Sequence, residues 1–353
     1  MLVLAQDALN AIEVQLLAAS GLLFLFISRR ERLTRKVKRP NLNLAIYSLG
    51  GPAPPLAFNH IWPQAKPLQN RTFDPCKWFC LMDYLQRSDE WIPKLGFGTS
   101  NLKGKEAEGA VEFALDVGYR HFDTANAYEN EQDIGPVLSR TEVSRERLFI
   151  TTKVWGTDLS RDRFLPSVEE SLRNLQLDYV DLLLIHWPHQ EVPLEEALDQ
   201  LQEAQHRQYA RLIGVSNFTI KLLEETRRLG APIVCNQFEY HPFLDQRKLR
   251  KASRDMGLFV TAYSPIAQGM VSDEPEIQDI AATHKVRPTQ VALRWLVQQE
   301  EVVAIPKSAK LRRIRENFDV FNFSLSPEEM DRISALRVRG LRLIDPKFAP
   351  QWD

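Results

Sequence analysis

The chain has 353 residues, of which 44% are hydrophobic and 26% are charged, and its 45 basic and 46 acidic side chains leave a formal net charge of −1. This composition excludes a disordered or collagen-like chain, and the balanced charge excludes the basic surface expected of a nucleic-acid-binding protein. The three cysteines, Cys76, Cys80 and Cys235, form neither a disulfide framework nor, without a second Cys or His pair, a zinc site, so we expect no metal and a reducing, cytoplasmic location.

Residues 1–81 differ from the rest of the chain, because they hold ten basic residues, four acidic residues and seven of the 21 prolines. Their apolar run, residues 16–27, is shorter than the roughly 20 residues of a membrane-spanning helix. Basic residues follow this run, whereas in a signal peptide they precede it. We expect an irregular extension outside the folded domain, arising from a misassigned start or an appended sequence. A weak membrane anchor and a disordered accessory segment are the alternatives, and residues 82–353 are the expected domain.

From residue 92 onward, one pattern recurs: a short apolar run rich in β-branched residues ends at a polar residue, and an amphipathic stretch follows. Eight strands are expected to end at Thr99, Asp123, Lys153, His186, Asn217, Gln237, Ser264 and Lys307. The clearest helices are expected over residues 106–117, 164–175, 194–204, 220–229, 246–256 and 289–298. This alternation predicts an α/β fold, a closed (β/α)8 TIM barrel. An open doubly wound sheet would usually carry G-x-G-x-x-G after its first strand, and GFGTSN lacks the third glycine.

Chemistry in such a barrel lies at the carboxyl ends of the strands, where Asp123, Lys153 and His186 are expected on three successive strands. Tyr128 follows the first of them. A nearby ammonium lowers the pKa of a phenol from about 10, and Asp123 can pair with Lys153. His186 can hydrogen-bond a carbonyl oxygen. Together these residues predict a proton donor aimed at a carbonyl group, with the electrons supplied by another group.

The motifs GYRHFDTANAYENE, ITTKVW, LLLIHWP, IGVSNF, TAYSP and IPKSAKLRRIRENF resemble those of the aldo-keto reductases over nearly all of residues 82–353. Within that family, the chain is most similar to the bacterial 2,5-diketo-gluconate reductases, particularly the B type that also reduces methylglyoxal. The resemblance implies hydride transfer from NADPH to an aldehyde or ketone. It also implies that Tyr128 is the general acid, that Asp123 and Lys153 lower its pKa, and that His186 orients the substrate.

The same resemblance implies a set of residues that bind the nicotinamide end of the cofactor. Ser216, Asn217 and Gln237 match residues that hold the carboxamide group, and Tyr263 matches the aromatic residue that stacks on the nicotinamide ring. Ser264, at the end of the same expected strand, completes this set.

A second set is expected at the phosphate end of the cofactor, directly after the last strand. The resemblance implies that Lys307, Ser308 and Arg313 contact the adenosine 2′-phosphate and that Asn317 lies near the adenine. The N-terminus of a helix favours phosphate, and arginine grips it with two hydrogen bonds. We therefore expect NADPH in preference to NADH.

The loops beside the expected site are short, which favours small, polar, activated carbonyl compounds. Trp155 and Trp187 lie beside catalytic positions and are expected to line the substrate pocket, although core packing explains Trp187 equally well. We expect a monomer whose partner is a small carbonyl substrate. Two other functions remain open: a cofactor-sensing subunit of a larger complex, and an aldolase or isomerase on the same barrel.

Overall fold

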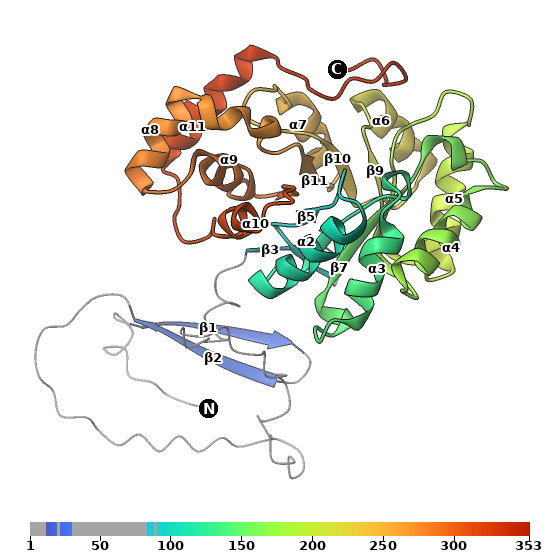
Figure 1. The fold of residues 1–353 in the computed structure, drawn as a ribbon, viewed down its shortest axis with the longest axis horizontal. Coiled ribbons are helices and arrows are strands. Elements are labelled where there is room, and N and C mark those ends of the chain that lie inside the picture. Colours follow the sequence, from blue (N-terminus) through green and yellow to red (C-terminus); the bar gives the residue numbers. More distant parts are fainter. Residues whose placement is uncertain (1–11, 20–21, 30–82, 88–89) are drawn as a thin grey trace, which may run out of the picture. The chain divides into compact units, whose positions relative to one another are not determined.

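The computed structural model describes residues 12–19, 22–29, 83–87 and 90–353, and the chain divides into two units, residues 1–63 and 64–353. In the first unit, β1 (Ile12–Ala19) pairs antiparallel with β2 (Leu22–Arg29) (Figure 1). The sequence analysis did not single out these strands, although the apolar run falls largely on them. None of the helices in the described part of the chain is long and apolar enough to span a membrane. Cys76, Cys80 and the expected boundary between residues 81 and 82 lie outside the described residues.

The second unit is built on a sheet of eight parallel strands, in which neighbouring strands are consecutive in the chain. The strands are β5 (Phe97–Gly98), β6 (His121–Asp123), β7 (Phe149–Val154), β8 (Val180–Ile185), β9 (Ala210–Ser216), β10 (Cys235–Glu239), β11 (Phe259–Tyr263) and β12 (Val302–Ala304). The sheet closes on itself because the Gly96 N–H donates to the Ala304 carbonyl at 2.8 Å and the Ala304 N–H donates to the Lys94 carbonyl at 2.9 Å. The predicted (β/α)8 barrel is therefore confirmed.

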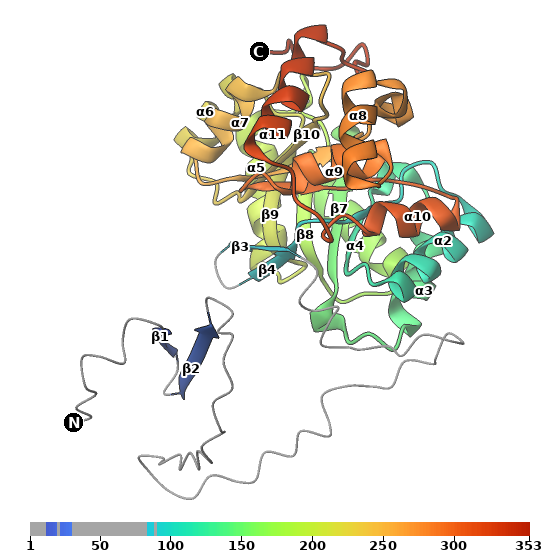
Figure 2. The same ribbon diagram turned by 90° about the vertical axis from the view of Figure 1, so that its left-hand side faces the viewer.

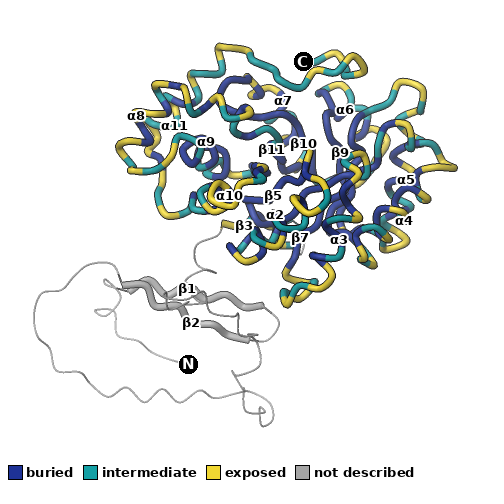
Figure 3. Tube along the Cα trace, viewed as in Figure 1, coloured by how far each residue is buried: buried dark blue, intermediate teal, exposed yellow. Residues whose placement is uncertain are grey.

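Helices form the outer layer of this barrel (Figures 1 and 2). They are α2 (Gly104–Val117), α3 (Glu131–Arg140), α4 (Phe164–Leu175), α5 (Leu194–His206), α6 (Ile220–Leu229), α7 (Arg247–Asp255), α8 (Pro275–His284), α9 (Pro288–Val297), α10 (Leu311–Phe318) and α11 (Pro327–Ala335). All six helices whose ranges the sequence predicted are present. Their amphipathic pattern follows from this arrangement: in Figure 3 the barrel strands are buried, and the exposed positions concentrate on the outer sides of the helices.

The amino end of the barrel is closed by a hairpin of β3 (Tyr84–Arg87) and β4 (Glu90–Pro93), which the sequence analysis missed. Leu85 and Ile92 of this hairpin are buried against side chains inside the barrel, including Phe149, Leu184 and Phe259. Because the hairpin closes the amino end, the polar side chains of the barrel gather at the carboxyl end of the strands.

The close contact between α3 and α4 depends on Gly135. A Cβ atom at this position in α3 would lie 2.2 Å from the carbonyl oxygen of Asn174 and 2.6 Å from the Cα of Leu175, at the end of α4. Both obstacles are backbone atoms, so the helices would have to move apart to accept a side chain.

We predict that Gly135→Ala lowers the free energy of unfolding by about 1–3 kcal/mol, because the added methyl group overpacks this contact. Gly109→Ala is the matched control, since a Cβ on this residue of α2 meets nothing within 4 Å. It should raise the free energy of unfolding by about 0.5–1 kcal/mol, because alanine favours a helix interior over glycine. Denaturant unfolding measures both, and equal stability of the two variants would contradict this account of the α3–α4 contact.

Candidate active site

Parallel strand register brings three ionisable side chains together at the carboxyl end of the barrel. Asp123 is the last residue of β6 and pairs with Thr151 of β7, so Lys153 lies two residues farther toward that end. His186 directly follows β8. All three side chains are buried. These three groups meet because each lies at or next to the carboxyl end of its strand, as the sequence predicted.

An ion pair between Lys153 and Asp123 is the centre of this group. The Lys153 Nζ donates to Asp123 Oδ1 at 2.6 Å, to the Thr124 carbonyl at 2.7 Å and, at 3.4 Å, to the Tyr128 hydroxyl. An ammonium has three donors, so each N–H is used. The other carboxylate oxygen of Asp123 accepts from Gln237 Nε2 at 2.8 Å. Burial acts to lower the pKa of Lys153, but the charge of Asp123 and the hydrogen bonds to Asp123 and Tyr128 raise it overall, so Lys153 stays a cation.

Tyr128 is positioned by a short loop that follows β6. It ends a 3₁₀ turn, Asn126–Tyr128, and the next residue, Glu129, has a φ of 47°, in the left-handed region. The buried Asn130 then fixes the loop, because its Nδ2 donates to the carbonyls of Thr99 at 2.8 Å and Leu102 at 2.9 Å. The hydrogen bonds of Asn130 therefore hold the loop in the conformation that places the Tyr128 phenol beside Lys153.

The pKa of Tyr128 is set by opposing effects of burial and neighbouring charges. Burial raises this pKa above its ordinary value, and although Lys153 opposes the change, the net direction is upward. The expected effect of Lys153 is therefore present but is outweighed by burial, whereas Asp123 acts to raise the pKa, because a carboxylate disfavours a nearby phenolate. The phenol consequently keeps its proton at neutral pH, which is the form that donates one.

His186 lies edge-on to two aromatic rings, with ring centroids 5.6 Å from Tyr128 and 5.1 Å from Trp155. Burial, aided by the charge of Lys153, lowers the pKa of His186 well below its ordinary value. Its Nδ1 is buried and has no hydrogen-bond partner among the described residues. The imidazole is therefore neutral at pH 7 and can form a hydrogen bond, whereas it is a poor source of a proton.

The residues expected at the nicotinamide end lie at the same end of the barrel. Asn217 Nδ2 donates to the His186 carbonyl at 3.0 Å and to Ser216 Oγ at 3.1 Å, and the Tyr263 hydroxyl donates to Asn217 Oδ1 at 2.8 Å. Asn217 and Ser264 have φ angles of 62° and 48°, which is uncommon for residues other than glycine. Such strain often marks functional positions. The Gln237 side-chain amide also lies at this end, where its Nε2 donates a hydrogen bond to Asp123.

The residues expected at the phosphate end lie at and beyond the end of β12. Lys307 and Arg313 are exposed, whereas Ser308 and Asn317 are buried. Ser308 Oγ accepts from the Lys310 N–H at 3.0 Å, and no side chain caps the N-terminus of α10. Uncapped N–H groups beside two exposed cations suit a phosphate group.

The C-terminal tail contributes aromatic side chains that the sequence analysis did not assign to the site. The Phe348 ring lies edge-on to both predicted tryptophans, with centroids 5.6 Å from Trp155 and 5.4 Å from Trp187. Trp352 lies 6.1 Å from Trp187 in the same way. The aromatic residues of FAPQWD were the available signal. We call Trp155, Trp187, Phe348 and Trp352 the aromatic cluster.

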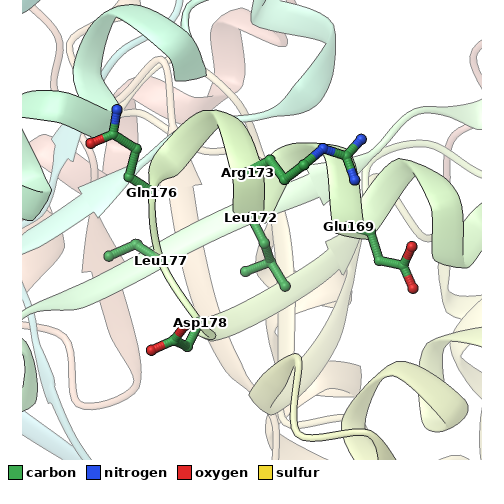
Figure 4. Close-up of a pocket in the computed structure, with 6 residues that line it drawn as sticks. All are labelled: Glu169, Leu172, Arg173, Gln176, Leu177 and Asp178. Carbon is green, nitrogen blue, oxygen red and sulfur yellow. The ribbon is translucent and has the colours of Figure 1, made fainter.

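Features elsewhere do not compete with this site. A surface depression of about 510 Å³ is lined by Glu169, Leu172, Arg173, Gln176, Leu177 and Asp178 (Figure 4). It lies between the end of α4 and the start of β8, which is the opposite end of the barrel from Lys153. Among the described residues, no three His, Cys, Asp or Glu side chains are grouped to hold a metal ion.

We predict that Lys153→Met lowers the free energy of unfolding by about 3–5 kcal/mol, because it leaves the Asp123 carboxylate buried without its counter-charge. The double variant Asp123→Asn with Lys153→Met should lose less than this single variant, since no uncompensated charge remains. Denaturant unfolding of the double variant and of each single variant, Lys153→Met and Asp123→Asn, tests the ion pair. A double variant whose loss equals the sum of the two single losses would show that the charges do not interact.

Comparison with known proteins agrees with this geometry. Residues 94–338 match the model of the aldo/keto reductase family. Methylglyoxal reductase DkgB of Escherichia coli O157:H7 is 40% identical over 267 residues, covering 74% of this chain and 99% of that protein. Glyoxal reductase of Bacillus subtilis (strain 168) is 42% identical over 248 residues, 69% of this chain and 89% of that protein. A crystal structure of a candidate 2,5-diketo-D-gluconic acid reductase B superposes with a TM-score of 0.75 at 42% identity, covering 77% of this chain and 98% of that chain.

Proposed function

The chain belongs to the aldo/keto reductase family, and we propose that it reduces a small aldehyde or ketone to the alcohol with NADPH, using Tyr128 as the general acid. One observation carries the proposal: a protonated phenol, a buried ammonium and a neutral imidazole converge at the carboxyl end of the barrel. The Lys153 Nζ lies 3.4 Å from the Tyr128 hydroxyl, and the Tyr128 and His186 ring centroids are 5.6 Å apart.

Each of these side chains has a distinct task in reduction. Tyr128 donates its phenolic proton to the carbonyl oxygen as negative charge develops there, and Lys153 stabilises the phenolate that remains. Asp123 keeps Lys153 charged and in place. His186, neutral because its pKa is lowered, donates a hydrogen bond to the same oxygen and orients the substrate. The phenolate then regains a proton from water.

A nicotinamide cofactor supplies the hydride that the carbonyl carbon accepts, and this chain's residues fit such a group. Ser216, Asn217, Gln237, Tyr263 and Ser264 offer amide, hydroxyl and aromatic groups beside His186. Lys307, Ser308 and Arg313 suit the 2′-phosphate, and Asn317 suits the neighbourhood of the adenine. The exposed cations before and within α10 therefore favour NADPH over NADH.

The substrate class follows from the relatives and from the aromatic cluster. Two relatives are named methylglyoxal and glyoxal reductases, and a similar structure is a candidate 2,5-diketo-D-gluconic acid reductase B. Phe348 restricts the space beside Trp155 and Trp187. We therefore assign methylglyoxal, 2,5-diketo-gluconate or a similar small keto-sugar as the substrate.

We predict that Tyr128→Phe lowers kcat/KM for methylglyoxal by about 100- to 10,000-fold, because it removes the transferable proton. The dissociation constant of NADPH should stay within about twofold, since the ring itself is kept. Tyr209→Phe is the matched control: its hydroxyl donates to Glu169 at 2.9 Å, far from the site, and its loss should leave kcat/KM unchanged. Near-normal turnover by the Tyr128 variant would remove Tyr128 as the acid.

We predict that Arg313→Ala weakens NADPH binding by about 10- to 100-fold, because a charge-assisted hydrogen bond to the 2′-phosphate is lost, and leaves NADH binding nearly unchanged. Arg315→Ala on the same helix is the control, since this guanidinium lies over the Phe113 ring at 5.3 Å. Fluorescence titration with each cofactor separates the variants. Equal losses for NADPH and NADH in the Arg313 variant would place this residue elsewhere.

A further inference from the structure

The last thirteen residues of the chain cross the carboxyl end of the barrel. The tail, residues 341–353, begins where the Leu341 N–H donates to the Phe243 carbonyl at 2.9 Å. It ends where Asp353 Oδ2 accepts from the Ile220 N–H, at the start of α6, at 2.8 Å. Between these two points it brings Phe348 to Trp155 and Trp187. The tail is therefore attached at both ends and carries half of the aromatic cluster.

Glu239 is a buried attachment point of the tail. It is the last residue of β10, its side chain is fully buried, and its neighbour across the sheet is Tyr263. One carboxylate oxygen accepts from the Leu343 N–H at 2.7 Å, and the other accepts from the Ile344 N–H at 2.9 Å. The His241 Nε2–H donates to the first oxygen at 2.8 Å.

The other ring nitrogen of His241 shows which tautomer is present. The Phe243 N–H donates to His241 Nδ1 at 3.3 Å, so Nδ1 is the acceptor and Nε2 carries the hydrogen. This bond and the two tail amides are the hydrogen bonds to the Glu239 carboxylate in the described part of the chain. A buried carboxylate is costly unless hydrogen bonds satisfy it. Two of its three donors are backbone groups of the tail, so the carboxylate and the tail stabilise one another.

The position of Glu239 determines where the downstream aromatic residues lie. Only three residues separate Ile344 from Phe348, and the Arg342 guanidinium lies over the Trp352 ring at 3.8 Å from its centroid. Phe348 is 47% exposed, so packing alone holds this side chain weakly. The hydrogen bonds from the Leu343 and Ile344 N–H groups to Glu239 restrain the backbone just before Phe348, which compensates for the weak packing of its ring.

We propose that Glu239 is a positioning residue for substrate selection: it holds the tail so that Phe348 completes the aromatic cluster against which the substrate binds. This proposal rests on the proposed reductase function. In the described part of the chain, the Glu239 carboxylate hydrogen-bonds His241 and the tail and not Tyr128, Lys153 or His186, so its effect is on substrate binding and not on proton transfer. The tail is then part of the substrate site, although no residue in it performs chemistry.

The first test is hydrogen exchange of the full chain carrying Glu239→Gln. A glutamine presents one oxygen, so one of the two tail amides loses its acceptor. Exchange of a peptide covering residues 341–353 should become about 10- to 100-fold faster, because a hydrogen bond to a charged acceptor is lost. Peptides covering β10 and β11 should keep their protection. Unchanged exchange in the tail peptide would overturn the proposal.

Asp181→Asn is the matched control. Asp181 is also a buried strand carboxylate, and its Oδ2 accepts from the Ile150 N–H at 2.8 Å and pairs with Arg145 at 2.7 Å. It is the second residue of β8, at the opposite end of the barrel. This variant should leave the exchange of the tail peptide and the KM for methylglyoxal unchanged, and a faster tail here would mean that general destabilisation explains both variants.

The second test is kinetic and uses Phe348→Ala alone and combined with Glu239→Gln. Each single variant should raise the KM for methylglyoxal about three- to tenfold and keep kcat within about twofold, because aromatic contacts are lost and the proton donor is not. If Glu239 acts through Phe348, the double variant should be no worse than the poorer single variant. Additive losses, or a fall in kcat with an unchanged KM, would overturn the proposal.

Ile344→Pro covers the case in which Glu239→Gln does not fold. It removes one of the two donors from the tail side and leaves every barrel residue in place. It should reproduce the faster exchange of the tail peptide and the higher KM, and normal values of both would overturn the proposal. Failure of the reductase function looks different, because then the unmodified chain turns over no carbonyl compound while the exchange comparison remains readable.

Discussion

A charged ammonium without access to water dictates the arrangement of the active end of this barrel. Lys153 is fully buried, and moving such a cation out of water is affordable only when a counter-charge and hydrogen bonds surround it. Asp123 supplies the charge at 2.6 Å, and the Thr124 carbonyl supplies a further acceptor. Two adjacent parallel strands in fixed register are what bring these groups together. A slip of the register by one residue would turn Lys153 toward the other face of its strand and separate the pair.

The electrostatic state of the other site residues depends on this pair. The charge of Lys153 acts to lower the pKa of both Tyr128 and His186, while burial raises the first and lowers the second. The result is a phenol that holds its proton next to an imidazole that lacks a charge. Asp123 also accepts a hydrogen bond from Gln237, so the pair joins the acid–base group to the strand expected to contact the cofactor. The proposed proton donor and the proposed cofactor-binding strand are thereby joined by one hydrogen-bond network.

Sequence periodicity predicted the eight barrel strands, because a short, mainly apolar run followed by an amphipathic stretch recurs along the chain. The β3–β4 hairpin was missed because strands of four residues, YLQR and EWIP, are too short to show an alternating pattern. Helix α8 was missed because only Ile277, Ile280 and Ala281 are buried along it.

The four proposed catalytic residues, Asp123, Tyr128, Lys153 and His186, and their shared location followed from the strand ends and from the family resemblance, but two features of the site did not. The sign of the Tyr128 pKa shift depends on the balance between burial and a 3.4 Å contact, which no motif encodes. The role of the tail depends on Glu239 meeting Leu343, 104 residues later in the chain. Sequence patterns cannot predict a contact between residues so far apart in the chain, because the folded barrel alone brings them together.

The measurement that tests the central claim most directly is steady-state consumption of NADPH by the full chain in the presence of methylglyoxal, with the alcohol product quantified in parallel. The account predicts saturable consumption, with one molecule of alcohol formed for each NADPH oxidised. Tight NADPH binding without consumption, with methylglyoxal and with a panel of keto-sugars, would contradict it. The intact ion pair and phenol would then belong to a protein that senses the cofactor and does not reduce a carbonyl group.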